Sequence, residues 1–377
     1  MAINTIKQID LSNKKQVKAF LRLPEIIYRD DPLWVPPLQN DALRMLNIRK
    51  NPFFKHSTAA FFLAFDGNGC PVARLACLNH RPFNAYNQEK TAFFYLFESM
   101  DLPGISVSLF EAAAAYARQQ GLNKIIGPKG FSALDGLGLL SEGFEFRPAL
   151  GIPYNPSYYI PLIEEAGFQM TDEILSGFMK RGFERDPKID IIARRVQERR
   201  GLTIAQFRTR RDLRKLVPQL HDLYNDAIKG TVGNFPITIE EARNMANQIL
   251  WLADPTMIKI VMKGSRPVGF LFAYPDPSNA LQRSKGRLFP LGWLYILHEL
   301  KTTHWLNVNG AGMIEEFRGS GGTAILFNEI VKSSANSRYT HAEVVQIGAK
   351  NERMLRELSN LGITFCKKHR MYSRLIE

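Results

Sequence analysis

Hydrophobic residues alternate with short polar turns in two blocks of the chain. The first block spans residues 60–76 around an Asp-Gly-Asn-Gly turn, and the second spans residues 258–271 around a Lys-Gly-Ser turn. Apolar runs of this length on either side of a glycine turn predict β-hairpins. In both blocks a Pro-Val pair opens the second run, at Pro71 and at Pro267.

A second pair of markers repeats with the same separation along the chain. Asn155 precedes a helical pattern at 156–166, Asn351 precedes one at 352–361, and a glycine follows each pattern. Asn is a good N-cap residue, and Gly commonly follows the end of a helix. Two ordered markers that repeat together indicate two copies of one fold.

The repeat predicts a first domain at 1–182, a basic linker or helix at 183–201, and a second domain at 202–377. In the second copy we expect strands and helices to alternate, with an insertion after the hairpin, at 203–208, 211–229, 238–251, 258–271, 275–303 (the insertion), 305–314, 323–334, 342–347, 352–361 and 370–375. In the first copy we expect further elements at 3–9, 14–26, 92–97, 105–120 and 124–126. This order predicts an α/β fold with a mixed sheet, present twice.

Composition adds an excess of positive charge. The 377 residues carry 49 Lys and Arg against 36 Asp and Glu, a formal net charge of +13, and basic residues concentrate at 194–215 and in the tail. An anionic cofactor, an anionic membrane surface and nucleic acid are candidate partners, and a solvated helix is the plain alternative. Nucleic acid is disfavoured, because the sequence has no zinc spacing, basic zipper or aromatic-basic RNA motif.

The cysteines and the N-terminus bear on the cellular compartment. Cys70, Cys77 and Cys366 are odd in number and lack metal-ligand spacing, so we expect reduced thiols and no metal site. The N-terminal residues have no apolar core of signal-peptide length, and the apolar run at 288–297 is too short to span a bilayer. These features predict a cytoplasmic protein.

The most informative stretch is the basic, glycine-rich turn at 316–326, between an apolar run and a helical pattern. In a strand, glycine turn and helix, backbone amides converge on an anion and the helix start adds a partial positive charge. We therefore predict a pyrophosphate site in which Arg318 adds a full charge to the turn residues Gly319, Ser320, Gly321, Gly322 and Thr323.

The element order and this turn resemble the GNAT superfamily of acyl-coenzyme A N-acyltransferases. Its signature is Arg or Gln, two residues, Gly, one residue, and Gly or Ala; here Arg318 and Gly321 match, and Thr323 departs from the last position. The resemblance implies that the loop amides bind the pyrophosphate of a coenzyme A thioester, acetyl or longer. It also implies that a splayed strand, including Gly312, Met313 and Ile314, and the Asn351 region lie along the pantetheine arm.

A narrower likeness reaches the first half of the chain. The segments 28–37, 50–54, 94–98 and 127–144 resemble a group of bacterial two-domain GNAT-like proteins described as N-acetyltransferases. Some of their relatives are taken to be ceramide-forming acyltransferases, which join a long acyl chain to an amine. The likeness implies a small-molecule or lipid amine as the acceptor.

Acyl transfer needs a base for the amine, a donor for the oxyanion and an acid for the thiolate. The strand before the loop contains no carboxylate, and we take Asn309 on it as a catalytic candidate. Leu358 occupies the place where the family often has a Tyr acid, so Tyr372 on the final strand is the next candidate, with a packed aromatic as the alternative.

The first copy shows the opposite pattern. Glu98 stands at the end of its fourth strand, where a base could sit, and a carboxylate paired with an Arg is the alternative. In its loop Asp101 would repel a pyrophosphate, and Pro103 removes an amide donor. We therefore expect the first copy to lack the cofactor and to help form the acceptor site.

Two further segments are candidates for binding. The loop at 128–153 is long and glycine-rich, which is typical of a binding loop or lid, or of a surface loop held down by contacts. The insertion at 286–297 is strongly apolar, and it could line an acyl-chain cavity, dock on an anionic membrane or pack as a plain helix.

Together these patterns predict direct acyl transfer from a coenzyme A thioester to an amine. A non-catalytic acyl-coenzyme A or lipid-binding protein, and a basic module that binds membranes or nucleic acid, are the alternatives. The sequence gives no prediction of the oligomeric state.

Overall fold

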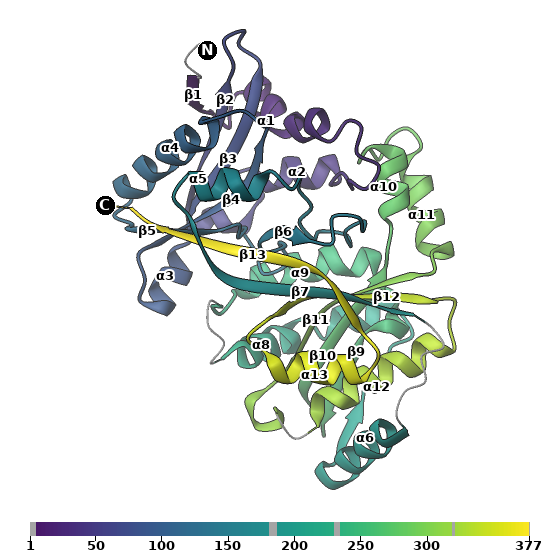
Figure 1. Cartoon of the computed structure of the whole chain (residues 1–377). Coiled ribbons are helices and arrows are strands. Elements are labelled where there is room, and N and C mark those ends of the chain that lie inside the picture. Colours follow the sequence, from purple (N-terminus) through teal and green to yellow (C-terminus); the bar gives the residue numbers. More distant parts are fainter. Residues whose placement is uncertain (1–4, 181–186, 230–233, 319–320, 377) are drawn as a thin grey trace. The chain divides into compact units, whose positions relative to one another are not determined.

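The computed structural model describes residues 5–180, 187–229, 234–318 and 321–376, and the chain forms two compact units (Figure 1). Unit 1 comprises Met1–Ile174, Asn279–Tyr295 and Lys367–Glu377, and unit 2 comprises Leu175–Ser278 and Ile296–Cys366. Each unit has its own cluster of buried apolar residues.

Unit 1 contains a sheet with the strand order β1–β2–β3–β4–β5–β13, and β6 pairs with β13. The pair β4–β5 is parallel, and the pairs β1–β2, β2–β3, β3–β4, β5–β13 and β6–β13 are antiparallel. Its elements are β1 (Thr5–Gln8), α1 (Lys14–Ile27), α2 (Gln39–Met45), η1 (Pro52–Lys55), β2 (Thr58–Phe65), β3 (Pro71–Asn79), α3 (Arg81–Asn87), β4 (Thr91–Ser99), α4 (Ile105–Gln119), β5 (Lys124–Gly127), β6 (Leu139–Glu142), α5 (Tyr159–Glu165), most of α10 (Ser278–Ser284) and most of β13 (Thr364–Leu375).

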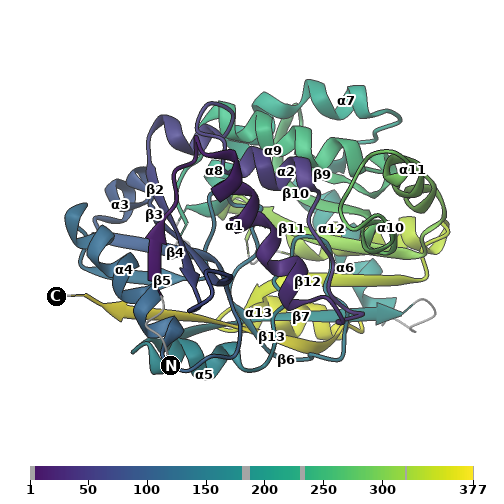
Figure 2. The same ribbon diagram turned by 90° about the horizontal axis from the view of Figure 1, so that it is seen from above.

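The sheet of unit 1 is covered on both faces, which explains why its central strands are almost wholly apolar. Phe62 belongs to the cluster that contains Leu109 and Phe110 of α4, whereas Phe61 packs edge-on against Phe20 of α1, with ring centroids 5.6 Å apart. Because neighbouring residues of a strand point to opposite faces, α1 and α4 lie on opposite faces of β2 (Figure 2).

Unit 2 has the strand order β7–β12–β11–β10–β9–β8, in which β11–β12 is parallel. The hairpin β9–β10 and the pairs β10–β11 and β8–β9 are antiparallel. Its elements are the end of β7 (Gln169–Lys180), α6 (Pro187–Arg200), β8 (Leu202–Ile204), α7 (Arg210–Lys215), α8 (Val217–Ile228), α9 (Ile239–Leu252), η2 (Pro255–Met257), β9 (Lys259–Lys263), β10 (Arg266–Pro275), most of α11 (Gly292–Thr302), β11 (Trp305–Met313), η3 (Glu315–Phe317), α12 (Gly322–Ala335), β12 (His341–Gly348) and α13 (Glu352–Asn360).

The end of the last strand of each copy belongs to the unit formed by the other copy. In unit 1, β13 pairs with β5, from Tyr372 opposite Gly127 to Leu375 opposite Lys124. In unit 2, residues 175–180 of β7 lie beside β12, where the Gln346 N–H donates to Ser176 Oγ. The compact units therefore differ in extent from the predicted 1–182 and 202–377 domains, which follow the sequence repeat and remain a prediction.

Most predicted elements are present, and three expectations are wrong in detail. The single helix expected at 211–229 is divided into α7 and α8, because Pro218 lacks an N–H and stands in the first turn of α8. The final strand is much longer than 370–375. Asn155 does not cap α5, whose N-cap is Tyr158.

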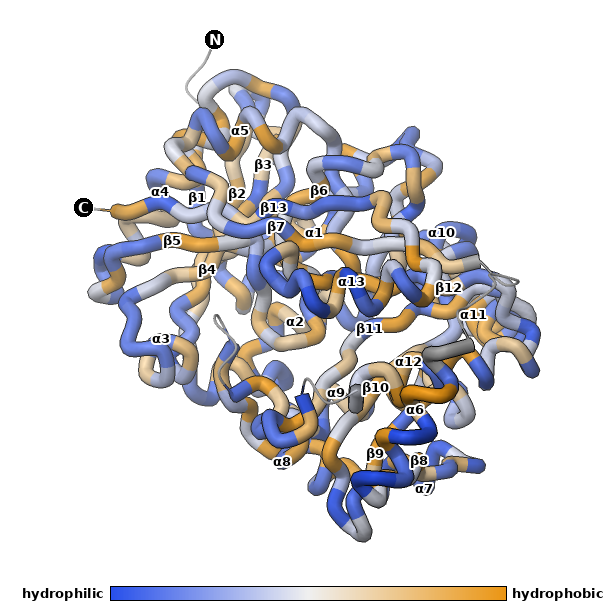
Figure 3. Tube along the Cα trace, turned by 60° about the horizontal axis from the view of Figure 1, so that its bottom comes forward, coloured by the Kyte–Doolittle hydropathy of each residue, from blue (hydrophilic) through white to orange (hydrophobic). Residues whose placement is uncertain are grey.

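The basic residues at 194–215 lie on consecutive elements of unit 2. The basic stretch covers the end of α6, β8 and α7, and its arginines are among the most hydrophilic positions in Figure 3. At the start of α9, Thr238 and Glu241 form a capping box in which each side chain accepts a hydrogen bond from the backbone N–H of the other.

The loop at 128–153 is held within unit 1 by several polar contacts. The buried Asn155 amide accepts from Leu140 N–H at 2.7 Å and donates to its carbonyl at 3.2 Å. Lys367 Nζ donates to the Arg147 carbonyl at 2.6 Å, and β6 within the loop pairs with β13. These contacts are those of a surface loop tied to the sheet.

His369 on β13 gives this anchoring a pH dependence. Its Nε2 lies 2.9 Å from the Pro153 carbonyl oxygen, and burial lowers the pKa of the ring from 6.5 to about 4. Between pH 6.5 and pH 4 the ring is protonated in the unfolded chain but not in the folded one. Its contribution to the free energy of unfolding is therefore fully present above pH 6.5 and is lost as the pH falls toward 4. We expect this ring to account for a loss of about 3 kcal/mol, measured by urea unfolding across that range.

The His369→Gln variant is the control, because its amide keeps a donor for Pro153 but does not titrate. Burial raises the pKa of Asp135 to about 6, which has the opposite sign but is common to both proteins. Subtracting the two pH curves therefore isolates His369, and parallel curves would contradict the prediction.

Candidate functional site

In unit 2 the parallel strands β11 and β12 pair only along their first halves. Their register runs from Trp305 opposite His341 to Val308 opposite Val344, and β11 then continues to Met313 while β12 continues to Gly348. On the other edge of β11 the register with β10 shifts between Leu271 and Ala273, which marks a bulge. Within this bulge Gly310 has a φ of 103°, a conformation that favours glycine. The two strands thus separate beyond Val308, as the resemblance implies.

The pairing of β11 with β10 decides which backbone groups face this opening. Ile314 N–H donates to the Val268 carbonyl on β10 at 3.0 Å. Because successive residues of a strand direct their N–H and C=O groups to opposite edges, Met313 and Ala311 direct theirs toward the β12 side. Of the residues predicted to lie along the pantetheine, Met313 therefore directs its backbone groups toward the opening, and Gly312 and Ile314 direct theirs toward β10. Ala311, which the sequence did not mark, also faces the opening.

After β11 the chain passes through η3 to the start of α12. The N-cap Gly321 has a φ of 87°, and a Cβ there would lie 2.8 Å from Val196 Cγ2 of α6. A Cβ on Gly322 would lie 2.6 Å from Met313 Cε and 3.0 Å from the Phe317 carbonyl oxygen. Backbone alone fits here, and the first N–H groups of α12, including that of the half-buried Thr323, have no partners within the helix. The predicted contacts Gly319 and Ser320 lie outside the described residues.

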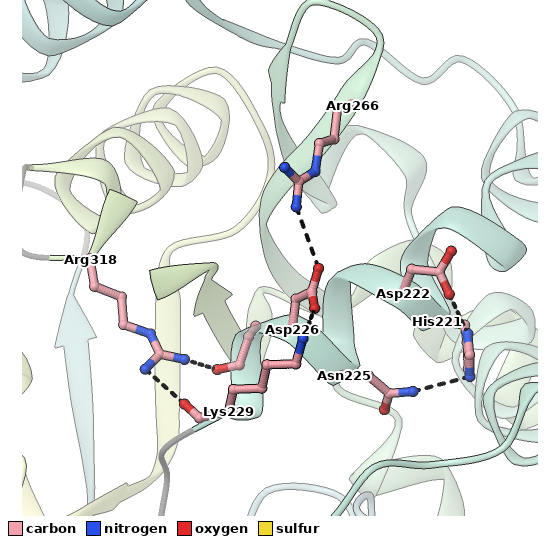
Figure 4. A network of polar contacts seen from close by, with 8 residues as sticks. His221, Asp222, Asn225, Asp226, Lys229, Arg266 and Arg318 are labelled. Carbon is pink, nitrogen blue, oxygen red and sulfur yellow. Dashed lines mark hydrogen bonds and ion pairs between the residues drawn. The ribbon is translucent and has the colours of Figure 1, made fainter. Parts of the chain in front are cut away.

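Arg318 anchors the loop to the end of α8 (Figure 4). Its Nε donates to the Met313 carbonyl at 3.0 Å, its Nη1 donates to the Lys229 carbonyl at 3.1 Å, and its Nη2 donates to the Ala227 carbonyl. The guanidinium thus satisfies carbonyls at a helix C-terminus, which ordinarily lack partners. The positive charge of Arg318 therefore lies beside the loop, but its N–H groups are bonded to backbone carbonyls and hold the loop in place.

The same end of α8 carries other polar contacts that Figure 4 shows. Asp226 accepts from Lys229 Nζ at 2.6 Å and from Arg266 Nη2 at 3.5 Å, and the hydrogen bond from Lys229 is the main cause of its lowered pKa. Asn225 exchanges two hydrogen bonds with the backbone of Ile237. These bonds fix the helix end to which Arg318 is attached.

At α13 the sequence predictions are confirmed for the helix itself. Asn351 is its N-cap, and its side-chain oxygen accepts from Met354 N–H at 3.2 Å. Leu358 is completely buried in the core of unit 2. The position where the family often has a Tyr is therefore a packing position.

A buried polar cluster lies at the point where β11 and β12 begin to separate. On β11, Leu306 and Val308 belong to the apolar cluster with Phe327 and Ile330 of α12, so Asn307 and Asn309 face the opposite side of the sheet. We call the cluster on that side the polar face; it consists of Tyr274, Asp276, Asn307, Asn309 and Glu343.

The members of the polar face come from three adjacent strands and their ends. Asn309 Nδ2 donates to Tyr274 Oη at 3.3 Å, and Asn307 Nδ2 donates to Asp276 Oδ1 at 3.1 Å. Glu343 is opposite Asn307 in the register of β11 and β12. Burial, with the nearby charges of Asp276 and Glu343, raises the pKa of Tyr274 to about 12. Two carboxylates thus lie near Asn309, although β11 itself carries none.

Unit 1 repeats the strand separation but closes it with tyrosines. Its parallel pair β4–β5 ends at Phe93 opposite Ile126, and Met100 N–H donates to the Val72 carbonyl as Ile314 does to Val268. Ser99 is therefore the counterpart of Met313. The Ser99 N–H donates to Tyr159 Oη at 2.9 Å, and the Ser99 carbonyl accepts from Tyr158 Oη at 2.9 Å.

In unit 2 the helix in the same place carries no such hydroxyls. Tyr158 and Tyr159 are the third and fourth residues after Asn155, and Met354 and Leu355 are the third and fourth after Asn351. The two tyrosines that bind the Ser99 backbone in unit 1 thus have no counterpart on α13.

Glu98 is bound on both carboxylate oxygens within unit 1. Oε2 accepts from Tyr28 Oη and from Tyr159 Oη, each at 2.8 Å, and Oε1 lies 3.5 Å from Arg74 Nη2. Burial raises the pKa of this carboxyl, and Arg74 opposes the rise. The contacts match the alternative interpretation, a strand-end carboxylate paired with an arginine.

Tyr372 is also in unit 1, not in the unit that carries the glycine loop. Its side chain is completely buried, and its hydroxyl lies 3.5 Å from Glu164 Oε1. The structure therefore brings together Asn309, the strand contacts and the loop in unit 2, while Glu98 and Tyr372 belong to unit 1.

The residues that the structure describes contain no cluster of three or more His, Cys, Asp or Glu side chains arranged to hold a metal ion. Over the same residues, every helix falls short of the length and apolar character needed to cross a bilayer.

The chain is similar along nearly its whole length to two known proteins. It is 28% identical over 374 residues to Protein YghO of Escherichia coli K12, covering 97% of this chain and 94% of that protein. It is 26% identical over 381 residues to the bacterial ceramide synthase of Caulobacter vibrioides, covering 98% and 97%. No protein-family model matches the chain.

Among solved structures, the chain resembles a tandem GNAT protein from the clavulanic acid biosynthesis pathway, with a TM-score of 0.57 at 10% identity. The superposition covers 100% of this chain and 99% of the other. Two hairpins, two parallel strand pairs that separate, and two helices behind left-handed glycines agree with that likeness. The chain therefore has the tandem GNAT fold, a mixed α/β fold in which one GNAT unit occurs twice.

Proposed function

We propose that the protein is an N-acyltransferase that takes its acyl group from a coenzyme A thioester bound to unit 2. The observation that carries this proposal is the difference between the two strand openings. In unit 1, Tyr158 and Tyr159 occupy the backbone groups of Ser99. In unit 2 the equivalent carbonyl of Met313 accepts from Arg318 of the loop, whereas the Met313 N–H is directed toward an opening that no tyrosine of α13 fills. An N–H at this edge suits a carbonyl group of a pantetheine arm.

The residues of unit 2 fit a coenzyme A thioester in two places. The backbone of Ala311 and Met313 would run beside the pantetheine arm, and the N–H groups from Gly321 to Thr323 would hold the pyrophosphate. The close packing of Gly322 supports this fit, because a cradle of backbone leaves room for phosphate oxygens. The bound thioester supplies an activated acyl carbon and a good leaving group.

The positive charge of α6 supports an anionic ligand at this loop. Val196 of α6 contacts the position of Gly321, while Arg194, Arg195 and Arg199 are exposed on the same helix. Clustered positive charge raises the local concentration of an anion and speeds its association. Part of the net charge of +13 thus has a role beside the loop.

Glu343 is the residue that we propose as proton acceptor for the attacking amine. It precedes Val344, the last paired residue before the strands separate, so it lies at the apex of the opening. Its carboxylate would take the amine proton directly or through a water, while the nitrogen bonds to the acyl carbon and the carbon–sulfur bond breaks. Asn309 and Tyr274 flank the same apex and would orient the reacting groups.

The acceptor that we propose is a lipid amine. Its support is the full-length similarity to a protein named bacterial ceramide synthase, together with the predicted resemblance to ceramide-forming enzymes. In such a product a long acyl chain is joined to the amine of a long-chain base. Unit 1 would then contribute structure, and its Glu98 cluster would hold α1 and α5 to the sheet.

Thr323→Asp tests the cofactor site. Aspartate in the first turn of α12 interacts favourably with the helix dipole, so the fold should keep its stability, but it should repel a pyrophosphate. We expect calorimetric titration with coenzyme A, acetyl-coenzyme A and palmitoyl-coenzyme A to show binding by the parent and a loss of at least about tenfold in the variant.

Two matched control variants distinguish the effect of the added charge at the loop from a general loss of structure. Thr323→Val keeps the shape without the charge, and Ser108→Asp adds the same charge to the first turns of α4 in unit 1. Both should bind like the parent. Arg318→Glu is unsuitable, because loss of its three backbone hydrogen bonds would also release the loop. No binding to any of the three ligands would refute the cofactor assignment.

Glu343→Gln tests the chemistry. With palmitoyl-coenzyme A and sphinganine as probes, we expect the variant to lose at least about a hundredfold in kcat while its acyl-coenzyme A dissociation constant changes by less than about twofold. The control is Glu329→Gln on α12, a carboxylate of the same unit that pairs with Lys332.

The same assay distinguishes transfer from binding alone. Release of free thiol that requires the amine supports the transferase. Tight binding of palmitoyl-coenzyme A with no thiol release across short and long amines would instead favour the non-catalytic acyl-coenzyme A-binding protein.

A further inference from the structure

An apolar tip projects from the insertion between β10 and β11. We define it as residues 289–297, in which five large apolar side chains are at least 40% exposed: Phe289 at 78%, Leu291 at 50%, Trp293 at 42%, Leu294 at 44% and Leu297 at 50%. Single exposed apolar residues are common on proteins, but five within nine positions form a patch that indicates a binding surface.

The tip is not the outer face of an ordinary amphipathic helix. On α11 the buried residues are Gly292, Ile296 and Leu300, each one turn from the next, as expected for the face that packs on the protein. The exposed face of such a helix is normally polar, yet here it carries Trp293, Leu294 and Leu297 beside His298 and Lys301. Core packing therefore explains one side of α11 and leaves the other side unexplained.

The base of the insertion is fixed within unit 1. Gln282 Nε2 donates to the carbonyls of Pro32 and Trp34 at 2.8 and 3.0 Å, and Gln39 N–H donates to the Gly286 carbonyl at 2.9 Å. Gly286 has a φ of 70°, and a Cβ there would lie 2.2 Å from the Pro37 carbonyl oxygen. Hydrogen bonds thus fix the segment that carries the tip, so less conformational entropy is lost when the tip binds a partner.

The charged residues that precede the tip along the chain are all basic. Arg283, Lys285 and Arg287 precede it and are exposed, and no acidic residue occurs between Asp276 and Glu299. The Arg283 guanidinium lies over the Tyr295 ring, 4.1 Å from its centroid, so this cation is held next to the apolar residues. The partner must therefore offer an apolar layer bordered by negative charge.

We propose that the tip inserts into the interfacial layer of an anionic lipid bilayer, with Arg283, Lys285 and Arg287 at the phosphate groups. Aromatic and leucine side chains above a row of cations are the composition of segments that lie in the membrane interface. A protein partner would need its own apolar pocket ringed by acidic groups, whereas a bilayer of acidic lipids offers both features everywhere. This inference goes beyond acyl transfer and does not depend on it.

The proposal is tested by co-sedimentation of the full chain with vesicles of phosphatidylcholine alone and of phosphatidylcholine with 30% phosphatidylglycerol. We expect binding to the anionic vesicles, and we expect Phe289→Ser to lower the partition coefficient about tenfold, since burial of a phenyl ring contributes a large share of such affinity. Tyr86→Ser, which removes an exposed aromatic on α3, is the matched control and should bind like the parent.

Two further measurements separate insertion from general attraction to a chain of net charge +13. Trp293 is the only tryptophan in the exposed class, and all four lie in the described part of the chain, so its fluorescence should shift to the blue and be quenched by brominated lipids. Trp293→Phe should abolish that signal while keeping the binding. Arg287→Glu should weaken binding more than Lys15→Glu, which changes the net charge equally on α1.

Three outcomes would overturn the proposal. Binding that Phe289→Ser leaves unchanged, with Trp293 still open to aqueous quenchers, would assign the attraction to charge alone. No binding to anionic vesicles would remove the membrane as the partner. A dimer in sedimentation velocity that Phe289→Ser dissociates, without vesicle binding, would assign the tip to a second copy of the chain.

Discussion

The structure depends on how backbone groups are satisfied where two parallel strands separate. Beyond Val308 and Val344, β11 loses its neighbour on one edge, and every N–H and C=O on that edge needs another partner. Unit 1 has the same separation beyond Phe93, and there two tyrosine hydroxyls fill the need at Ser99. In unit 2, Arg318 binds the carbonyl of Met313, and α13 has no tyrosine to bind its N–H. The same backbone geometry is therefore filled by two tyrosines in unit 1 and only partly filled in unit 2.

Much of the fold could be predicted from the sequence, because its signals are local. The hairpins, the glycine turn and the Asn351 cap each depend on residues within a few positions of one another. The polar face could not be predicted in the same way. Asp276 and Glu343 come from the neighbouring strands, and only the register that pairs Asn307 with Glu343 brings them to Asn309. A strand without a carboxylate therefore suggested a site without a base.

Arg318 and Ala311 illustrate two other limits. The signature marks Arg318 as part of the loop, but only the structure reveals that its donors bind carbonyls at the end of α8. Ala311 has no side-chain chemistry to mark it, and its place depends on the direction of its N–H. Backbone contacts of this kind leave little trace in residue types, since any residue that fits the strand supplies the same groups.

The exchange of final strands gives a physical reason for a first copy whose opening is filled by tyrosines to persist. Residues 175–180, at the end of the first copy, lie beside β12 in unit 2, and β13, at the end of the second copy, lies beside β5 in unit 1. Loss of either copy would leave a sheet edge of the other unit unpaired, at a cost of several backbone hydrogen bonds. Changes that close the opening of unit 1, such as Tyr158 and Tyr159, leave this pairing intact. The first copy can therefore change at its opening while its fold stays necessary to the other unit.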